Sequence, residues 1–491
     1  MPQPPTTPPA PLMLSVSGLR GLIGQSLTPP VAARFAAAFG TWLRTQSKEA
    51  SPRVVIGRDS RPSGEMIELA AAAGLISVGC EVIALGIATT PTTAVMVEHL
   101  KAAGGMVITA SHNPIIWNGI KCLRYDGVAP PPAEANEIIR RFKEDDVSHV
   151  PVESLKAMRR DDTGSRVHID RILPLIDVDA IRKAKLKCVL DSVHGAGGPA
   201  TAQLLEELGV ELVHLYGEPT GLFPHTPEPT RDNLTELAAA VAKHKAHVGF
   251  AQDPDADRLA LVDERGTYIG EEYTLVLCAM HVLGAPSRQG GAESERTPAA
   301  TGAPAVRVSI APPCRDGAPV VAANLSTSRM IDDVAARFGA TVVRTAVGEA
   351  NVAAAMKSHH APVGGEGNGG IIVPRVTYVR DSLTGIALTL ELLATRGKPL
   401  SAIVDEIPRY AIVKDKLPFD PAVAARLVSS LKQVFSTQKI DLQDGVRIDW
   451  PDRWVHARPS NTEPIMRIIA EAPTESDANE LIAKVRAALG V

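Results

Sequence analysis

Short apolar segments alternate with helical patterns along three stretches of the chain, and this alternation limits the possible folds more than any other feature. In residues 198–208, Leu204, Leu205 and Leu208 lie at helical spacing, and a strand pattern follows at 211–215. Strands that alternate with helices predict parallel sheets with right-handed crossovers. The expected strands are 54–56, 81–85, 106–109, 188–190, 211–215, 247–251, 319–324 and 341–344, and the expected helices are 63–78, 92–102, 198–208, 233–243, 328–338 and 350–358.

The C-terminal part of the chain has a different pattern. Strand patterns at 445–449, 453–457 and 466–471 lie close together between helical patterns at 421–436 and 476–489, which predicts a smaller α+β domain. We therefore expect an α/β protein of three related units and this fourth domain. The expected divisions are a disordered Pro-rich leader at 1–11, domain 1 at 12–160, domain 2 at 166–268, domain 3 at 269–398 with a disordered insertion at about 284–318, and domain 4 at 402–491.

Composition excludes several classes of partner. The net charge of −4 gives no electrostatic reason to expect a nucleic acid or an anionic membrane. No segment approaches the roughly 20 consecutive apolar residues that span a membrane. The five cysteines are few, scattered and odd in number, which indicates reduced thiols in a cytoplasmic protein without a disulfide framework or a zinc site.

A polar cluster follows the strand pattern at 106–109. It consists of Thr109-Ala-Ser-His-Asn-Pro114 and, shortly after, Asn118-Gly-Ile-Lys121. Ligands of parallel α/β sheets bind beyond the carboxyl ends of the strands, so Ser111, flanked by His112, is a candidate nucleophile. Ser, Asn and Pro are also ordinary turn residues, and a polar turn is the alternative.

Three carboxylates alternate along the segment Asp253-Pro-Asp-Ala-Asp-Arg258. Carboxylate oxygens suit Mg²⁺, and three of them so close together repel one another unless a cation neutralises them. The segment lies between apolar strand patterns, so it is not a solvated acidic tail. It predicts a metal site, with a capped turn as the alternative.

Two further loops have compositions that suit polar ligands. Residues 364–370 contain five glycines with Glu366 and Asn368, which could bind sugar hydroxyls or form a hairpin tip. The segment Arg458-Pro-Ser-Asn-Thr462, with Arg467 on the next strand pattern, has the donors of a phosphate cradle, although a surface turn is equally compatible. Three more arginines near turns fit the same interpretation: Arg20, Arg58 and Arg61.

Together, a serine, a magnesium site, a hydroxyl-binding loop and a phosphate cradle predict phosphoryl transfer to a sugar phosphate. With the motifs TASHNP and NGIK, DPDADR, GEGNGG and RPSNTEP in this order, the chain resembles the α-D-phosphohexomutase superfamily over nearly its whole length. The resemblance implies four domains around a central cleft, one Mg²⁺ per chain and a small-molecule hexose phosphate as substrate.

The resemblance also implies a role for each candidate residue. Ser111 would be a phosphoserine that passes its phosphoryl group to the sugar, and a hexose 1,6-bisphosphate would be the intermediate and activator. Asp253, Asp255 and Asp257, with the phosphate of Ser111, would hold Mg²⁺. The other expected site residues are Arg20, Lys121 and His112 for proton transfer and charge stabilisation, Arg258 at the phosphoserine, Glu366 and Asn368 at the sugar, and Arg458, Ser460, Asn461, Thr462 and Arg467 at the second phosphate.

The chain departs from the family at the sugar loop. Many relatives end this loop in Ser-Gly-His, where this chain has Asn368-Gly-Gly370 and no imidazole. The variant resembles a subset of bacterial phosphoglucosamine mutases, so we expect conversion of glucosamine 6-phosphate to glucosamine 1-phosphate first and phosphomannomutase/phosphoglucomutase activity second. A phosphate-ester hydrolase with Asp253 as nucleophile, a non-catalytic sugar-phosphate-binding paralogue, and either a monomer or a homodimer stay open.

Overall fold

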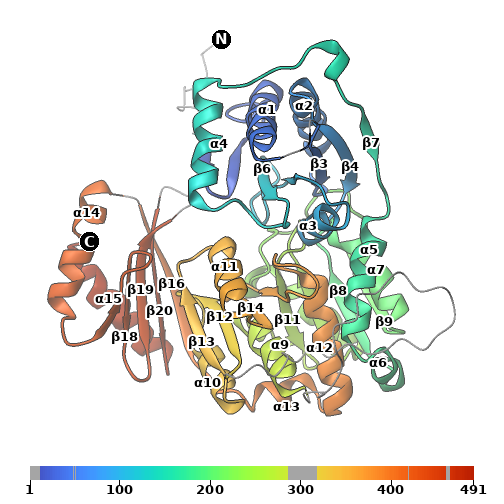
Figure 1. Cartoon of the computed structure of the whole chain (residues 1–491). Helices are drawn as coiled ribbons and strands as arrows, with labels where there is room; N and C mark the ends of the chain where they lie inside the picture. Colours follow the sequence, from blue (N-terminus) through green and yellow to red (C-terminus); the bar gives the residue numbers. More distant parts are fainter. Residues whose placement is uncertain (1–11, 48, 50, 286–317, 419, 461–464) are drawn as a thin grey trace, which may run out of the picture. The chain divides into compact units, whose positions relative to one another are not determined.

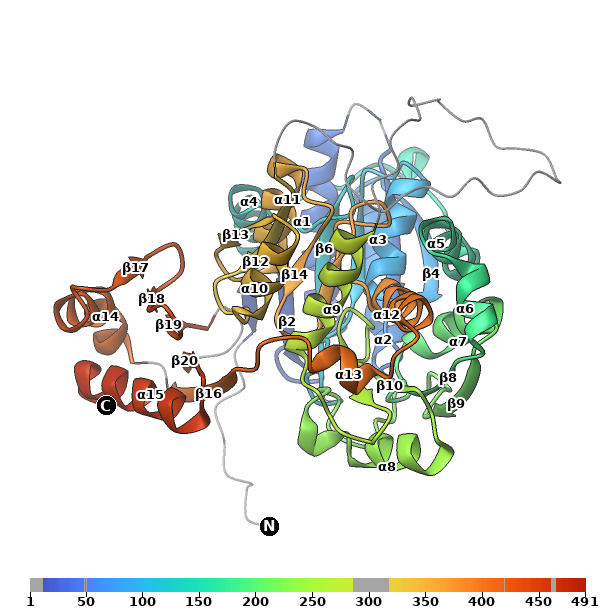
Figure 2. The same cartoon turned by 90° about the horizontal axis from the view of Figure 1, so that it is seen from below.

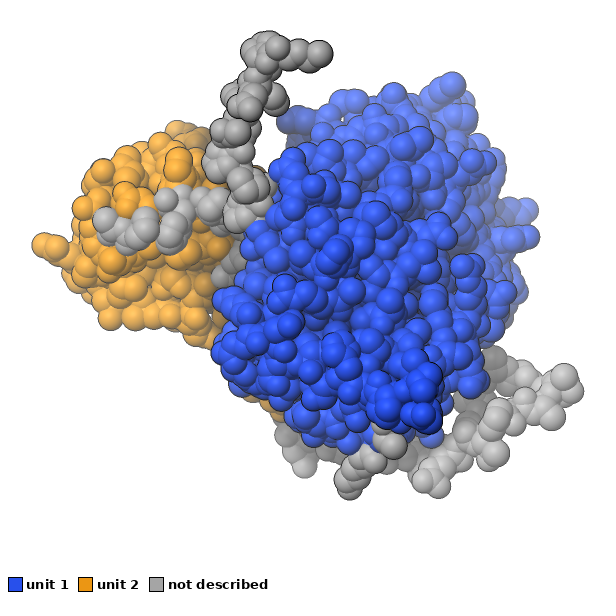
Figure 3. Space-filling model, turned by 90° about the horizontal axis from the view of Figure 1, so that it is seen from above, with its two compact units in different colours: residues 1–271, 304–308, 375–400 blue, residues 272–303, 309–374, 401–491 orange. Residues whose placement is uncertain are grey.

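The computed structural model describes residues 12–47, 49, 51–285, 318–418, 420–460 and 465–491. The expected leader and almost all of the expected insertion lie outside these residues. The chain divides into two compact units, one of residues 12–271 with Arg375–Leu400 and one of residues 272–285, 318–374 and Ser401–Val491 (Figure 3). Among the described residues, no helix is both long enough and apolar enough to cross a membrane.

The first unit begins with a seven-stranded sheet of order β1-β2-β6-β5-β3-β4-β7. Its strands are Met13–Ser15 (β1), Gly18–Leu22 (β2), Arg53–Arg58 (β3), Glu81–Ile87 (β4), Gly104–Ile108 (β5), Trp117–Arg124 (β6) and Met158–Arg160 (β7), and its helices are Pro29–Gln46 (α1), Gly64–Ser77 (α2), Thr90–His99 (α3) and Pro132–Glu144 (α4). Helices α1 and α2 lie side by side (Figure 1), and buried Phe35, Phe39 and Leu75 join the hydrophobic core there. The parallel strands β5, β3, β4 and β7 confirm the predicted parallel sheet, whereas β6 pairs antiparallel with β5 and β2.

The second sheet of this unit has four strands in the order β11-β10-β8-β9. Its strands are Lys187–Asp191 (β8), Glu211–Leu215 (β9), Val248–Gln252 (β10) and Leu259–Asp263 (β11), and the helices of this part are Gly164–Ile172 (α5), Val178–Ala184 (α6), Gly197–Glu207 (α7), Thr235–His244 (α8) and Ser382–Arg396 (α12), with short 3₁₀ turns at Val152–Ser154, Leu173–Leu175 and Arg231–Asn233. Strands β8, β9 and β10 are parallel, but β11 runs antiparallel to β10. The reversal follows from the short loop between them, because parallel neighbours need a long crossover.

The second unit contains a related four-stranded sheet of order β13-β12-β14-β15. Its strands are Val320–Asn324 (β12), Thr341–Thr345 (β13), Val363–Glu366 (β14) and Gly370–Ile372 (β15), and its helices are Glu272–Gly284 (α9), Met330–Arg337 (α10) and Glu349–His359 (α11). Here too the first three strands are parallel and a tight loop leads into an antiparallel edge strand. The two four-stranded sheets thus repeat one arrangement, with a loop of candidate site residues at the same place in each.

The C-terminal part of the second unit is an antiparallel five-stranded sheet of order β16-β20-β19-β18-β17. Its elements are Ala411–Pro418 (β16), Pro421–Val434 (α14), Lys439–Asp441 (β17), Val446–Asp449 (β18), Trp454–Pro459 (β19), Ile465–Ala472 (β20) and Glu475–Leu489 (α15), preceded by the short helix Leu400–Val404 (α13). Helices α14 and α15 pack on the sheet (Figure 2), where Leu431 and Val485 are fully buried. This confirms the predicted α+β domain.

Helix α12, which the expected division assigns to domain 3, lies in the first compact unit. Arg375–Leu400 belongs to this unit, where α12 contacts α6, α7 and β11. The helix is almost completely buried, because apolar side chains occupy most of its faces. Its N-terminal end therefore enters the surroundings of the Asp253–Asp257 loop.

Candidate active site

The loop of Ser111 follows strand β5 and is held in an uncommon backbone conformation. Ser111 has φ 49°, in the left-handed region that few non-glycine residues adopt. Its N–H donates to Thr109 Oγ1 (2.8 Å), and the Thr109 hydroxyl donates to Asp59 Oδ2 (2.6 Å). The side chain of Ser111 is 3% exposed. These bonds fix the direction in which its hydroxyl points.

Arg61 also holds the loop of Ser111 in place. Its guanidinium is completely buried, pairs with Asp59, and donates to the carbonyl oxygens of Ser111 (2.8 Å) and Asn113. Arg58 instead pairs with Glu68 (2.9 Å). The sequence interpretation of Arg61 as a phosphate ligand is therefore wrong, because its guanidinium is completely buried and engaged within the fold; for Arg58 it stays a prediction.

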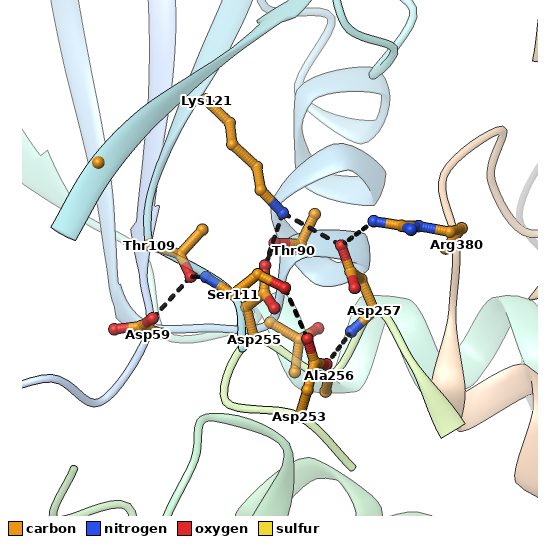
Figure 4. A network of polar contacts seen from close by, with 12 residues as sticks. Asp59, Thr90, Thr109, Ser111, Lys121, Asp253, Asp255, Ala256, Asp257 and Arg380 are labelled. Atoms are coloured by element: carbon orange, nitrogen blue, oxygen red, sulfur yellow. Dashed lines mark hydrogen bonds and ion pairs between the residues drawn. The ribbon is translucent and has the colours of Figure 1, made fainter. Parts of the chain in front are cut away.

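The three aspartates form a tight turn between β10 and β11. Asp253 Oδ1 accepts the N–H groups of Asp257 and Arg258 (both 3.1 Å), which closes the turn. The Ser111 hydroxyl donates to Asp253 Oδ2 at 2.7 Å, across 142 residues of sequence (Figure 4). The two motifs predicted separately therefore meet at one point.

The carboxylates of this turn have the geometry of a cation site. One oxygen from each of Asp253, Asp255 and Asp257 lies within 4.8 Å of the others, and all three residues are fully buried. Asp255 Oδ1 and Asp257 Oδ1 are buried and have no hydrogen-bond partner among the residues that the structure describes. Buried charged oxygens without partners are costly, so the donor set fits a hard divalent cation.

Two cations already approach the turn from neighbouring elements. Lys121 Nζ, on β6, lies 2.7 Å from Asp255 Oδ2 and 3.1 Å from Asp257 Oδ2, and Arg380 Nη2 lies 2.6 Å from Asp257 Oδ2 (Figure 4). Thr90, the first residue of α3, donates its hydroxyl to Asp255 Oδ2 (2.7 Å). The sequence interpretation missed Arg380 and Thr90, because neither lies in a recognisable motif.

The charges of this cluster shift one another's protonation. Burial and the neighbouring carboxylates raise the pKa of Asp253 well above its usual range. Burial alone would raise the pKa of Asp255 and lower that of Lys121, but their ion pair reverses both shifts, so both groups are charged at neutral pH. Lys121 in this state is an ammonium and cannot accept a proton.

Three other predicted residues surround the serine more loosely. Arg20 Nη1 donates to Asn113 Oδ1 (3.3 Å), and His112 Nδ1 lies 3.4 Å from Ser111 Oγ. Burial and nearby positive charge lower the pKa of His112 well below its usual value, so the ring is neutral. Arg258 extends to within 3.8 Å of Glu228 Oε1, a residue that no motif indicated.

The second unit holds the glycine-rich loop between β14 and β15. Glu366 Oε1 accepts from Asn324 Nδ2 (2.8 Å) and the N–H of Gly348 (3.1 Å). Asn368 Nδ2 donates to Glu366 Oε2 (3.3 Å), while Asn368 Oδ1 is buried without a hydrogen-bond partner. Glu366 thus helps to hold the loop, and the Asn368 carbonyl is the acceptor that a ligand hydroxyl could use.

The arginine motif of the second unit lies on β19 and β20, two inner strands of the C-terminal sheet. Arg458 on β19 is directly opposite Arg467 on β20, and Arg467 is in turn opposite Lys416 on β16. Like charges directly opposite each other are unfavourable unless an anion lies between them. Burial lowers the pKa of Arg458; its Nε has no hydrogen-bond partner among the described residues and lies 3.6 Å from Asp444 Oδ2. Lys416 was not predicted, and its position across the strands is the signal that indicates it.

The remaining residues of this motif are only partly described. The N–H of Ser460 donates to the Ile465 carbonyl (2.8 Å), which closes the loop. Asn461 and Thr462 lie outside the described residues. Within the first unit the structure therefore unites Ser111, the aspartates and Lys121, and within the second unit it describes Glu366, Asn368, Arg458, Ser460 and Arg467.

Known proteins resemble this chain over almost its full length. The family descriptions "Phosphoglucomutase/phosphomannomutase, alpha/beta/alpha domain I", "domain II" and "domain III" match residues 13–149, 166–266 and 308–410, and the family's "C-terminal domain" matches 412–488. A "Phosphoglucomutase/phosphomannomutase" of Thermococcus kodakarensis is 36% identical over 95% of each chain. A "Probable phosphoglucosamine mutase" of Methanopyrus kandleri is 34% identical over 95% of each chain.

A solved structure has the same fold. The phosphoglucomutase/phosphomannomutase family protein of Burkholderia thailandensis superposes with a TM-score of 0.79 at 26% identity, over 97% of this chain and 98% of its own. All four family domains are matched in order, and the serine and aspartate motifs meet at the contact of Ser111 with Asp253. The chain belongs to the phosphoglucomutase/phosphomannomutase family of phosphohexomutases, which are isomerases.

Proposed function

We propose that the protein moves a phosphoryl group between the 6 and 1 positions of a hexose phosphate, with Ser111 as the phosphoserine. The observation that carries this proposal is the 2.7 Å contact of the buried Ser111 hydroxyl with Asp253 at the three-carboxylate turn. Phosphoryl transfer requires positioning and charge stabilisation more than covalent chemistry by the protein, and this cluster supplies both.

Asp253, Asp255 and Asp257 would hold one Mg²⁺ per chain. Their oxygen donors suit this ion, and the unpartnered oxygens of Asp255 and Asp257 give it ligand atoms. When bound, the ion supplies charge stabilisation to the transferring phosphoryl group. Through its other oxygen, Asp253 closes the turn on backbone N–H groups, so the carboxylate is held in position before any ion binds.

The surrounding side chains would provide charge stabilisation and proton transfer. Lys121 and Arg20 stabilise negative charge on the phosphoryl group, and Arg258 contacts the phosphoserine. The raised pKa of Lys121 favours charge stabilisation over a role as general base while its carboxylate partners are ionised. His112 is neutral and lies 3.4 Å from the serine oxygen, so its ring has a nitrogen that can accept a proton, although its lowered pKa makes it a weak base.

The second unit would bind the sugar and its other phosphate. The Asn368 carbonyl, supported by Glu366, accepts a sugar hydroxyl or amino group. Arg458 and Arg467 flank the non-transferring phosphate, and Ser460, with Asn461 and Thr462, adds neutral donors. A hexose 1,6-bisphosphate would form when Ser111 donates its phosphoryl group, and it would return the other phosphate after reorienting.

Glucosamine 6-phosphate is the first candidate substrate. The Asn-Gly-Gly end of the sugar loop and the 34% identity to a "Probable phosphoglucosamine mutase" support it. Mannose and glucose phosphates are the second candidate, supported by the 36% identity to a "Phosphoglucomutase/phosphomannomutase". A coupled assay with the three sugar phosphates side by side separates them: a clear preference for glucosamine supports the first ranking, and equal rates contradict it.

The serine itself is tested in the same assay. We expect Ser111→Ala to abolish turnover, because no hydroxyl remains to carry the phosphoryl group, and Ser429→Ala, which removes an exposed hydroxyl on α14, to leave it unchanged. Turnover by Ser111→Ala would contradict the mutase mechanism. Absence of turnover by the unaltered enzyme in the presence of a hexose 1,6-bisphosphate would favour the non-catalytic paralogue.

A further inference from the structure

A buried histidine, His168, lies behind the aspartate turn and belongs to none of the motifs. It is on α5, is 0% exposed, and uses both ring nitrogens. Nε2 lies 2.9 Å from Asp381 Oδ2, and Nδ1 lies 3.0 Å from Thr92 Oγ1. A completely buried polar side chain with two partners has a defined orientation, and this one joins α3, α5 and the segment before α12.

The hydrogen bonds around His168 form a chain in which each group donates to the next. The Thr89 hydroxyl donates to Thr92 Oγ1 (2.7 Å), which leaves the Thr92 hydroxyl proton for His168 Nδ1. Nε2 then carries the ring proton and donates it to Asp381, whose other oxygen accepts the N–H of Leu383 (3.0 Å) as the N-cap of α12. Every member of the chain is satisfied by a neutral histidine.

The residues on each side of Asp381 hold the aspartate turn. Arg380 pairs with Asp257 at 2.6 Å. Ser382 donates its hydroxyl to the Ala256 carbonyl (2.7 Å), and Gln252 donates to the Ser382 hydroxyl (2.8 Å). Ala256 has φ 55°, in the left-handed region, which an alanine adopts only when the surrounding structure holds it there.

Thr90, two residues before Thr92 on α3, contacts the same turn. Thr90 donates its N–H to the Asp255 carbonyl (2.9 Å) and its hydroxyl to the Asp255 carboxylate (2.7 Å). His168 therefore links two segments that both contact the turn. Thr90 contacts Asp255, whereas Arg380 contacts Asp257 and Ser382 contacts Ala256.

We propose that His168 is a positioning residue for the cation site: it locks Asp381 to Thr92 and so fixes the carboxylates of Asp255 and Asp257. The assignment of the turn as a metal site rests on the proposed function, but the lock itself rests on the contacts above. Groups behind the ligands orient them, and their removal commonly weakens metal binding by about 10–100-fold.

The test measures Mn²⁺ binding to the full-length protein by electron paramagnetic resonance, alongside steady-state kinetics. His168→Leu removes both bonds, and we expect the dissociation constant for Mn²⁺ to rise about tenfold or more. The same change should lower kcat more than it raises KM for the hexose phosphate, since the second-unit residues bind the other phosphate. His168→Gln, which keeps an N–H donor for Asp381, should recover part of the affinity.

Two further variants keep the test decisive. Thr92→Val keeps the bond from His168 to Asp381 and removes the Thr92 hydroxyl, with its bonds to His168 and Thr89, at little change of volume; it decides the question if His168→Leu does not fold. Leu75→Ala destabilises the α1–α2 core, a cluster that contains none of the residues of the lock, and should leave Mn²⁺ binding unchanged. Folded variants of His168 or Thr92 that bind Mn²⁺ within about twofold of the unaltered protein, or an equal loss in Leu75→Ala, would overturn the proposal.

Because Mn²⁺ binding is read without turnover, this result is separate from the proposed function. Absence of mutase activity in the unaltered enzyme would refute the function and leave the binding comparison intact. Normal activity together with unchanged Mn²⁺ binding in the His168 variants would refute the lock alone.

Discussion

Mild acid should loosen the C-terminal sheet through a single buried histidine. His456, on β19, is 1% exposed; its Nε2 lies 2.6 Å from the Asp444 carbonyl oxygen and its Nδ1 lies 2.9 Å from Ser326 Oγ. A carbonyl oxygen only accepts, so Nε2 carries the proton and the neutral ring accepts at Nδ1. A second proton would place a positive charge inside the protein, close to Arg458.

The magnitude and sign follow from the pKa of this ring. Burial, reinforced by the charge of Arg458, lowers the pKa of His456 from 6.5 to about 4. The folded state thus holds the neutral ring. The contribution of His456 to the free energy of unfolding is therefore complete above about pH 6.5 and is lost as the pH falls through about 4. One pKa unit corresponds to about 1.4 kcal/mol, which gives a loss of about 2 kcal/mol at about pH 5 and about 3 kcal/mol below pH 4.

Hydrogen exchange followed by mass spectrometry measures this loss locally, without assuming that a chain of several domains unfolds in one step. Peptides covering β18 and β19 should show an opening constant about thirtyfold larger at about pH 5 than at about pH 7.5, after correction for intrinsic exchange. His456→Gln cannot titrate and should lose this pH dependence. The same pH dependence in both proteins would refute the reasoning, because other groups would then be responsible.

Three further changes test other parts of the site. Lys121→Gln leaves two buried carboxylates without their ammonium partner and should lower the free energy of unfolding by about 3–5 kcal/mol in the absence of metal. We expect a lower Tm that added Mg²⁺ restores in part, and an unchanged Tm would contradict the ion pairs. Gly365→Ala places a Cβ 2.1 Å from the Gly370 carbonyl oxygen at φ 154°, so the sugar loop must move, and KM should rise; unaltered kinetics would show that the loop does not contact substrate. Arg458→Lys keeps the charge but loses the planar donor pair, so KM for the hexose phosphate should rise about tenfold with less change in kcat, and an unchanged KM would remove Arg458 from the phosphate site.

Local pattern was sufficient for most of the fold. Leu204, Leu205 and Leu208 predicted a helix at 198–208, and the structure has Gly197–Glu207. Helix α12 was missed although Leu383, Ile386, Leu390 and Leu393 lie at helical spacing and Gly397 marks its C-terminal end. The antiparallel edge strands were not foreseen either, since strand direction depends on loop length and not on the pattern within the strand.

The same distinction between local pattern and folded contacts applies to the candidate site. Ser111 and the aspartates were predicted because each occupies a compact motif, and the structure joins them at 2.7 Å. Arg380 and His168 could not be predicted, because only the folded chain brings them to partners 123 and 213 positions away. Arg61 illustrates the opposite error: it resembles a phosphate ligand in the sequence, and its role as support for the serine loop appears only from its burial.

The central claim is that Ser111 carries the phosphoryl group between the enzyme and the sugar. The most direct measurement loads the purified protein with radiolabelled phosphate from a hexose 1,6-bisphosphate, locates the label by peptide mapping, and then adds unlabelled hexose monophosphate in a single turnover. We predict label on Ser111 that passes to the sugar bisphosphate and then to the hexose phosphate. Label that stays on the protein, maps to Asp253, or is released as inorganic phosphate would contradict the account.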